Sequence, residues 1–354
     1  GWWKNGYPEY FAKVLNATAW NIIHVEVNGE VLDLAVTPVR DFLRELDMKR
    51  GVLTRSFVAE FKNGIHCQIT AQRFLSMAQE SMAAIRYSVK PLNGTAHIVF
   101  HSKLDGVVKN HDSNYDEIFW SPVHEEINNG VGSVVTRTKK TEFELAVAMC
   151  HESEGVNWER DERATSCVSA TFSGMIESGN EAILFKYIGL ENSLYQSKEE
   201  VNAYALQHAQ SAKDQGYALM LEEHTESWSE VWKMGDIVIK GDDEAQQGIR
   251  FNIFHLNQTY TGKDERLNIG PKGFTGEKYG GSTYWDTEAY CIPFYMATKN
   301  QDVARQLLTY RHVQLEKAIE NAGKLGFHSG AALYPMVTMN GEECHNEWEI
   351  TFEE

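Results

Sequence analysis

The sequence predicts a multidomain β + α protein, in which an antiparallel β-sandwich is followed by a helical linker and the first part of an α/α barrel. Three observations predict this arrangement. The chain has 354 residues, more than the roughly 250–300 that one hydrophobic core usually serves. Apolar residues alternate with a period of two from about 20 to 190. Near residue 196 the spacing becomes that of a helix.

The β region contains Asn-Gly pairs between predicted strands, and such pairs are the strongest short-range signal for a hairpin. Three pairs predict hairpins between neighbouring strands: Asn28-Gly29 joins 23–27 to 31–34, Asn63-Gly64 joins 57–61 to 65–70, and Asn93-Gly94 joins 84–89 to 96–100. Further strands are predicted at 133–137, 143–148, 167–172 and 182–187. Many short strands of this kind indicate a sandwich, which we expect to occupy 1–195.

A helical linker is expected at 196–241. Ser197 and Glu200 have the spacing of a capping box, and apolar residues at helical spacing follow them. A second helix is predicted after Gly216.

Residues 242–354 are expected to begin the barrel. Asp243 and Gln246 mark a helix start. One apolar stripe of this helix is formed by Ile249, Ile253, Leu256 and Tyr260. Two later helices are predicted, one at 286–299 with an interruption near Pro293 and one from about Val303 to Gly323 or Gly326.

Charge and cysteine content exclude several classes of partner. The chain has 33 Lys+Arg and 50 Asp+Glu, a formal net charge of -17, and its basic residues are scattered along the sequence. It should therefore repel nucleic acid and anionic lipid, and no apolar run approaches the ~20 residues that span a membrane. Five cysteines, at 67, 150, 167, 291 and 344, lack C-x-x-C spacing. They indicate free thiols in a reducing compartment, and we expect the cytoplasm.

No metal or cofactor is expected. The 13 histidines show no zinc-type spacing on a predicted helix, and the glycine-rich segment lacks the P-loop pattern G-x-x-x-x-G-K-[ST]. A nucleophilic Ser–His or Cys–His pair stays open, although no elbow motif supports one.

The segment 268–288 combines glycines, aromatic residues and carboxylates in a loop that runs into a helix. Adjacent Trp285 and Asp286 could contact a sugar together, because an indole packs on the C–H face of a pyranose and a carboxylate accepts from its hydroxyls. The alternative is a glycine-rich connection with a buried Trp285 and a helix-capping Asp286. Tyr279 is a weaker candidate, since it could serve only as a packing anchor, and Glu288 could serve only to compensate the helix dipole.

Three segments carry a resemblance to a known family. The glycine-rich run 272–288 resembles the signature loop of the disaccharide phosphorylases of glycoside hydrolase family sixty-five. The opening segment 1–10 and the run 330–354 are similar to the maltose-cleaving branch of that family. The resemblance extends over the whole chain and implies that the helical part belongs to an (α/α)6 barrel.

The resemblance also implies roles for individual residues. Trp285 and Asp286 match the pair that contacts the glucose unit whose anomeric carbon reacts. The segment His345 to Glu353 is similar to the loop that shapes the pocket of the acceptor sugar, and His345, Glu347 and Trp348 are its candidate residues. Any one of them could instead be a solvated side chain at a helix start.

The family's catalytic acid is expected outside this chain. In the family it is a Glu in a Gly-Pro-Asn-Glu-Tyr or Gly-Pro-Asp-Glu-Tyr motif, and a separate, later loop binds phosphate. The only Gly-Pro pair here is Gly270-Pro271, which Lys272 follows, so both features should lie beyond Glu354. We therefore expect a piece of a longer protein, lacking sequence on both sides and inactive alone.

The implied reaction is inverting phosphorolysis of maltose to β-glucose 1-phosphate and glucose. Inorganic phosphate is the co-substrate, and the full-length protein should be a homodimer. An inverting hydrolase would need a general base as well as an acid. Two alternatives remain: a phosphorylase of another α-glucobiose (kojibiose, nigerose or trehalose), or a fragment that binds sugar without chemistry.

Overall fold

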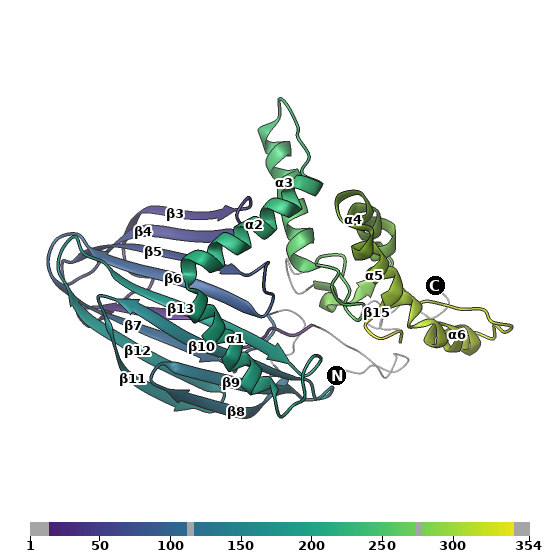
Figure 1. The fold of residues 1–354 in the computed structure, drawn as a ribbon, viewed down its shortest axis with the longest axis horizontal. Coiled ribbons are helices and arrows are strands. Elements are labelled where there is room, and N and C mark those ends of the chain that lie inside the picture. The colour runs from purple at the N-terminus through teal and green to yellow at the C-terminus, as the bar shows by residue number, and fades with distance from the viewer. Residues whose placement is uncertain (1–13, 112–116, 274–277, 343–354) are drawn as a thin grey trace. The chain divides into compact units, whose positions relative to one another are not determined.

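A computed structural model of the chain describes residues 14–111, 117–273 and 278–342 (Figure 1). These residues form two compact units. The first is the described part of 16–109 and 116–229, and the second is built mainly from the described part of 230–354.

The first unit is an antiparallel β-sandwich, as predicted (Figure 1). The smaller sheet has the strand order β11-β12-β7-β1-β2, and the larger sheet has the order β3-β4-β5-β6-β13-β10-β9-β8. The strands of the smaller sheet are β1 (Ala19–Val27), β2 (Glu30–Val31), β7 (Ala96–Asp105), β11 (Asn157–Ala164) and β12 (Cys167–Ile176). Those of the larger sheet are β3 (Val39–Asp47), β4 (Val52–Glu60), β5 (His66–Leu75), β6 (Met82–Pro91), β8 (Trp120–Asn128), β9 (Val131–Thr138), β10 (Glu144–Glu154) and β13 (Ala182–Asn192).

The larger sheet buries apolar side chains on both faces. Its inner face contributes Phe57 and Ile69 to a core that they share with Phe100 of the smaller sheet. On its outer face Tyr187 belongs to a second apolar cluster with helix α1 (Val201–Gln215). Strands β6, β10 and β13 are therefore apolar at successive positions instead of alternating.

Helix α1 lies directly on strand β13 at Gly189. A Cβ atom at this position would be 2.1 Å from the Ala205 carbonyl oxygen and 2.4 Å from the Ala209 nitrogen. Only glycine permits this approach of two backbones. The small residues on this face of α1 serve the same purpose, since Ala205, Ala209 and Ala212 are all fully buried.

Two of the three predicted hairpins are confirmed. Strands β1 and β2 pair through Asn28-Gly29, whose φ angles of 51° and 81° are those of a type I′ turn. Strands β4 and β5 pair on either side of Asn63-Gly64.

The third predicted hairpin is wrong. Strand β6 pairs with β5 and β13, whereas β7 pairs with β1 and β12 in the other sheet. The Asn93 side chain accepts a hydrogen bond from the His66 backbone N–H at 2.7 Å and donates to the Gly64 carbonyl at 2.9 Å. Asn93 therefore anchors a crossing between the sheets to the neighbouring loop.

Three strands that the sequence does not predict lie at sheet edges. They are β3, β8 and β11, and each is the outermost strand of its sheet. None of their residues is fully buried, and many are charged. An edge strand is paired on one side only and buries little, so it carries no apolar alternation.

The linker helices begin close to the predicted positions. Helix α1 starts at Val201, and α2 (Tyr217–Gly235) starts directly after Gly216. The Ser197 hydroxyl donates to the Glu200 carboxylate at 2.7 Å. No side-chain bond caps the backbone at Glu200, so the pair is in contact but does not form a capping box.

The second unit consists of short elements joined by loops. They are α3 (Asp243–Thr259), η1 (Lys278–Gly281), β14 (Thr283–Tyr284), η2 (Thr287–Cys291), α4 (Ile292–Thr298), α5 (Gln301–His312), α6 (Leu315–Lys324) and β15 (Val337–Thr338). Helix α3 is capped by Asp242, one residue before the predicted start, and its stripe residues Ile253 and Tyr260 are buried. The single helix predicted after Val303 is wrong, because the chain breaks it at Gln314 (φ -96°, ψ 9°). No glycine or proline signals this break.

Four cysteines in the described ranges are free thiols: Cys67, Cys150, Cys167 and Cys291. Cys344 lies outside the described residues. Within the described ranges, no helix is both long and apolar enough to cross a membrane.

Candidate sugar-binding site

The glycine-rich segment packs its own backbone closely. A Cβ atom on Gly270 would lie 2.6 Å from the Ser282 carbonyl oxygen. At Gly281, where φ is +70°, it would lie 2.5 Å from the Val14 side chain. Glycine at position 270 therefore lets the two ends of the loop approach each other, and glycine at position 281 lets the loop approach Val14. Residues 274–277, between them, lie outside the described residues.

Trp285 directly follows an anchored strand. Strand β14 pairs with β15, and Tyr284 is buried against Val337 and Met336. Thr283 and Tyr284 are both buried, whereas Trp285, the next residue, is exposed. The Trp285 side chain is 48% exposed, and its indole N–H donates to the Tyr334 carbonyl at 3.3 Å. This bond fixes the edge of the ring while about half of the residue stays exposed.

Asp286 is exposed beside Trp285 and makes no side-chain cap at the helix that follows. Among the described residues its carboxylate has no hydrogen bond or ion pair. The reading of this segment as a buried Trp with a helix-capping Asp is therefore wrong. An accessible indole and an uncommitted carboxylate stand next to each other, as sugar binding requires.

A π-helix begins immediately after this pair. In η2 the Ile292 N–H donates to the Thr287 carbonyl, five residues earlier, and Pro293 follows in α4. Proline has no N–H to donate, so the helix changes geometry where the predicted interruption falls. The Thr287 hydroxyl donates to the Ile269 carbonyl at 2.6 Å. This wide turn is thereby tied to the start of the glycine-rich loop, and such turns are frequent at functional sites.

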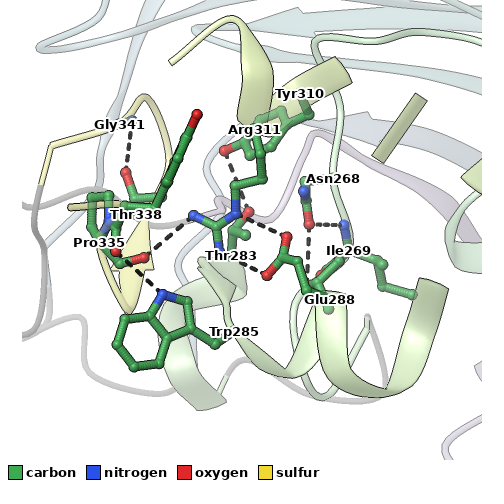
Figure 2. Close-up of polar contacts among 12 residues, drawn as sticks. Asn268, Ile269, Thr283, Trp285, Glu288, Tyr310, Arg311, Pro335, Thr338 and Gly341 are labelled. Atoms are coloured by element: carbon green, nitrogen blue, oxygen red, sulfur yellow. Dashed lines mark hydrogen bonds and ion pairs between the residues drawn. The ribbon is translucent and has the colours of Figure 1, made fainter. Parts of the chain in front are cut away.

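Glu288 and Arg311 form the strongest polar contact of the site (Figure 2). Arg311 Nε and Nη2 donate to the two Glu288 carboxylate oxygens at 2.9 and 3.1 Å. The third nitrogen, Nη1, donates to the Pro335 carbonyl at 3.3 Å. Arg311 therefore joins three parts of the site: α5, the start of η2 and the segment before β15. The same segment contains Tyr334, whose carbonyl accepts the hydrogen bond of the Trp285 indole.

Sequence reasoning missed Arg311. Glu288 is predicted either as a weaker sugar contact or as compensation of the helix dipole, and its partner is 23 residues away on another helix. No local pattern distinguishes Arg311 from Arg305 and His312 on the same helix.

A second set of bonds holds the opposite side of the site. The Thr283 hydroxyl donates to the Tyr310 hydroxyl, which donates to the Met339 carbonyl. The Asn321 amide of α6 donates to the Gly341 carbonyl at 3.1 Å. Helices α5 and α6 thus both hold the segment that contains β15.

The buried Cys291 thiol is unsuited to nucleophilic chemistry. Burial, followed by the charges of Asp286 and Glu288, raises its pKa to about 11. The thiol therefore stays protonated near neutral pH.

The other predicted site residues are not placed. Tyr279 belongs to η1, but its side chain is not described. His345, Glu347 and Trp348 lie outside the described residues. Within the described ranges, no group of three or more His, Cys, Asp or Glu could hold a metal ion.

A β-sandwich followed by helices is the arrangement that the family matches assign to carbohydrate-active proteins. Residues 1–231 match the N-terminal domain of glycosyl hydrolase family 65, and residues 250–354 match the family's central catalytic domain. The chain therefore belongs to glycosyl hydrolase family 65.

Relatives in this family include several named phosphorylases. The chain is 45% identical to a maltose phosphorylase of Bacillus subtilis over 100% of its length and 46% of that protein. It is 33% identical to an α,α-trehalose phosphorylase of Thermoanaerobacter brockii, covering 96% of the chain and 45% of the relative. A solved structure described as a putative kojibiose phosphorylase from human microbiome superimposes with a TM-score of 0.88 at 26% identity, covering 98% of this chain and 46% of that one. The chain thus spans about half the length of the curated relatives it matches.

Proposed function

We propose that this protein cleaves maltose with inorganic phosphate and releases β-glucose 1-phosphate and glucose. The accessible Trp285–Asp286 pair carries the proposal, because it offers both contacts that a glucose unit needs. The choice of maltose rests on sequence, since identity to the maltose phosphorylase is 45% against 33% for the trehalose phosphorylase and 28% for a kojibiose phosphorylase.

In this proposal Trp285 and Asp286 hold the glucose unit whose anomeric carbon reacts. The indole supports the apolar face of the ring, and Asp286 accepts hydrogen bonds from its hydroxyls. Glu288 and Arg311 act indirectly, because they hold the segment to which the indole is bonded. Tyr279 is proposed as a further contact of the same sugar.

The reaction is a single displacement with inversion. A phosphate oxygen attacks the anomeric carbon from the face opposite the glycosidic oxygen, and the glycosidic C–O bond breaks. A general-acid Glu protonates the departing oxygen, so that glucose leaves as a neutral alcohol. Phosphate is itself the nucleophile, so no general base is needed. We assign neither the acid nor the phosphate site to a residue of this chain, and we assign the helices of the second unit to an (α/α)6 barrel.

His345, Glu347 and Trp348 are proposed to shape the pocket of the second glucose unit. This pocket sets the linkage, so an enzyme for kojibiose, nigerose or trehalose would differ here and not at Trp285. The free thiols fit a reducing compartment, and we propose the cytoplasm. A homodimer is proposed for the full-length protein.

The test uses the full-length product of the gene. Maltose, trehalose, kojibiose and nigerose are each incubated with and without phosphate, and the products are followed by proton and phosphorus NMR. We expect phosphate-dependent cleavage of maltose and the β anomer of glucose 1-phosphate. Cleavage of another glucobiose instead would reassign the substrate, and release of glucose without phosphate would make the protein a hydrolase.

A further inference from the structure

A cleft on the sandwich unit gathers three arginines that are far apart in the sequence. It has a volume of about 280 Å³ and is lined by Arg44, Arg55 and Arg73, together with Phe42, Tyr87 and Asn21. Asn21 belongs to β1 of the smaller sheet, and the other five belong to β3, β4, β5 and β6 of the larger sheet. The cleft therefore opens between the two sheets.

Strand register explains why the arginines meet. Arg44 of β3 lies directly opposite Arg55 of β4. Arg55 lies opposite Ala71 of β5, so Arg73, two residues further on, is its diagonal neighbour on the same face. This is the inner face of the sheet, which Phe57 shares. Like charges directly opposite each other in a sheet are destabilising.

No carboxylate in the described part of the chain forms an ion pair with any of the three arginines. Arginines elsewhere do have such partners, as in Arg137–Glu144, Arg250–Asp236 and Arg311–Glu288. The contrast is informative in a chain with 50 acidic residues and a net charge of -17. The cleft concentrates uncompensated positive charge, and such an arrangement suits an anionic ligand.

The titration of Arg73 agrees with this geometry. Burial, followed by the charges of Arg44 and Arg55, lowers the pKa of its guanidinium. The three groups therefore interact with one another across the cleft.

We propose that this cleft binds a small sugar that carries a phosphate monoester. Guanidinium groups match the oxygens of a phosphate in pairs and prefer its dianion. Phe42 is 51% exposed and stacks on Phe57 with ring centroids 5.7 Å apart, so it offers an apolar surface to a pyranose ring. The exposed Asn21 amide can bond a sugar hydroxyl.

The inference is independent of the proposed reaction. None of the residues that line the cleft belongs to the glycine-rich loop, and failure to cleave maltose would leave the proposal unaffected. Glucose 6-phosphate is the probe for this reason, because it is neither substrate nor product of that reaction. Inorganic phosphate and glucose are the comparison probes, because each carries one of the two groups that glucose 6-phosphate combines.

The experiment is titration calorimetry on the full-length protein. We expect saturable binding of glucose 6-phosphate that weakens with added salt, weaker binding of phosphate, and no binding of glucose at the cleft. Arg55→Gln and Arg73→Gln should each weaken binding by about 10- to 100-fold, because each removes a charge-assisted contact. Arg163→Gln is the matched control, since Arg163 is exposed on edge strand β11 outside the cleft.

Folding is checked separately. Removing one of three mutually repelling charges should leave the thermal midpoint of Arg55→Gln equal to or above that of the wild type. Equal binding in the wild type and both cleft variants would overturn the site. Phosphate should also bind at the site of the proposed reaction, so the cleft is assessed by the loss of affinity in Arg55→Gln; an equal loss for phosphate and glucose 6-phosphate would overturn the sugar part. Absence of binding by every probe would also overturn the proposal.

Discussion

Arg311 holds Glu288 by two parallel hydrogen bonds and uses its remaining nitrogen to bond the Pro335 carbonyl. Arg311 is buried, at 7% exposure. The guanidinium therefore depends on these partners, because a buried charge that loses its partner keeps its desolvation penalty. The segment that it holds also contains Tyr334, which accepts the hydrogen bond of the Trp285 indole.

Glu288→Gln should destabilise the protein by about 2–3 kcal/mol, because it leaves the buried Arg311 without its counter-charge. Urea unfolding measures this effect. The matched control is Asp302→Asn, which breaks the exposed Asp302–Arg305 pair on α5, the helix that also carries Arg311. This substitution should cost less than ~0.5 kcal/mol. Equal effects of the two substitutions would show that Arg311 does not rely on Glu288.

Asp286→Ala should reduce kcat/KM for maltose phosphorolysis by roughly 30- to 1000-fold, through loss of about 2–4 kcal/mol of transition-state stabilisation. Its stability should not change, because the carboxylate bonds no described residue. Steady-state kinetics and thermal unfolding of the full-length enzyme measure the two effects. Glu316→Ala, an exposed acid on α6, is the control. Wild-type kinetics in Asp286→Ala would remove this residue from the sugar site.

Gly189→Ala should destabilise the sandwich unit by about 3 kcal/mol or more, because the new methyl group would overlap the backbone of α1. The control is Gly248→Ala in helix α3, where a Cβ atom meets nothing within 4 Å. That substitution should be neutral or stabilise by up to about 1 kcal/mol. Similar unfolding midpoints for both variants would contradict the close contact of α1 with β13.

His151 should make stability depend on pH. It is buried, its Nδ1–H donates to the Gly130 carbonyl at 2.7 Å, and its Nε2 accepts from the Ser102 hydroxyl at 2.8 Å. Burial, followed by the Lys186 charge, lowers its pKa to about 3, below the ~6.5 of an unfolded histidine. Between these values the unfolded state binds the proton, so stability is full above pH ~6.5 and falls as the pH drops toward 3.

Titration of His151 should change the free energy of unfolding by at most about 1.4 kcal/mol per pH unit. Urea unfolding at several pH values between 7 and 4 measures it in the wild type and in His151→Asn, which should lose this component. His312→Asn, an exposed position, should keep it. NMR titration of the His151 ring in the wild type provides a second test, since a midpoint near 6.5 would contradict the assignment even if His151→Asn fails to fold.

Much of the sandwich was predictable, because a buried strand carries its apolar pattern in its own residues. Strands β9, β12 and β13 contain the predicted segments, β4, β5 and β10 match theirs to within one residue, and Asn28-Gly29 forms the expected turn. Edge strands such as β3 were missed, since they bury little. The sheet to which a strand belongs could not be predicted from local sequence either. Asn93-Gly94 predicts a turn, but it does not determine which strands β7 pairs with.

The candidate site divides in the same way. The sequence by itself determined that Trp285 and Asp286 are adjacent at the start of a helix. It also determined that the loop before them is rich in glycine and that proline interrupts the helix that follows. Only the tertiary structure decided that both side chains are accessible, because this depends on burial of Tyr284 against Val337. The pairing of Glu288 with Arg311 and the meeting of Arg44, Arg55 and Arg73 were likewise decided by folding. These contacts join residues on separate elements, and their energies come from charge and burial that no local pattern contains.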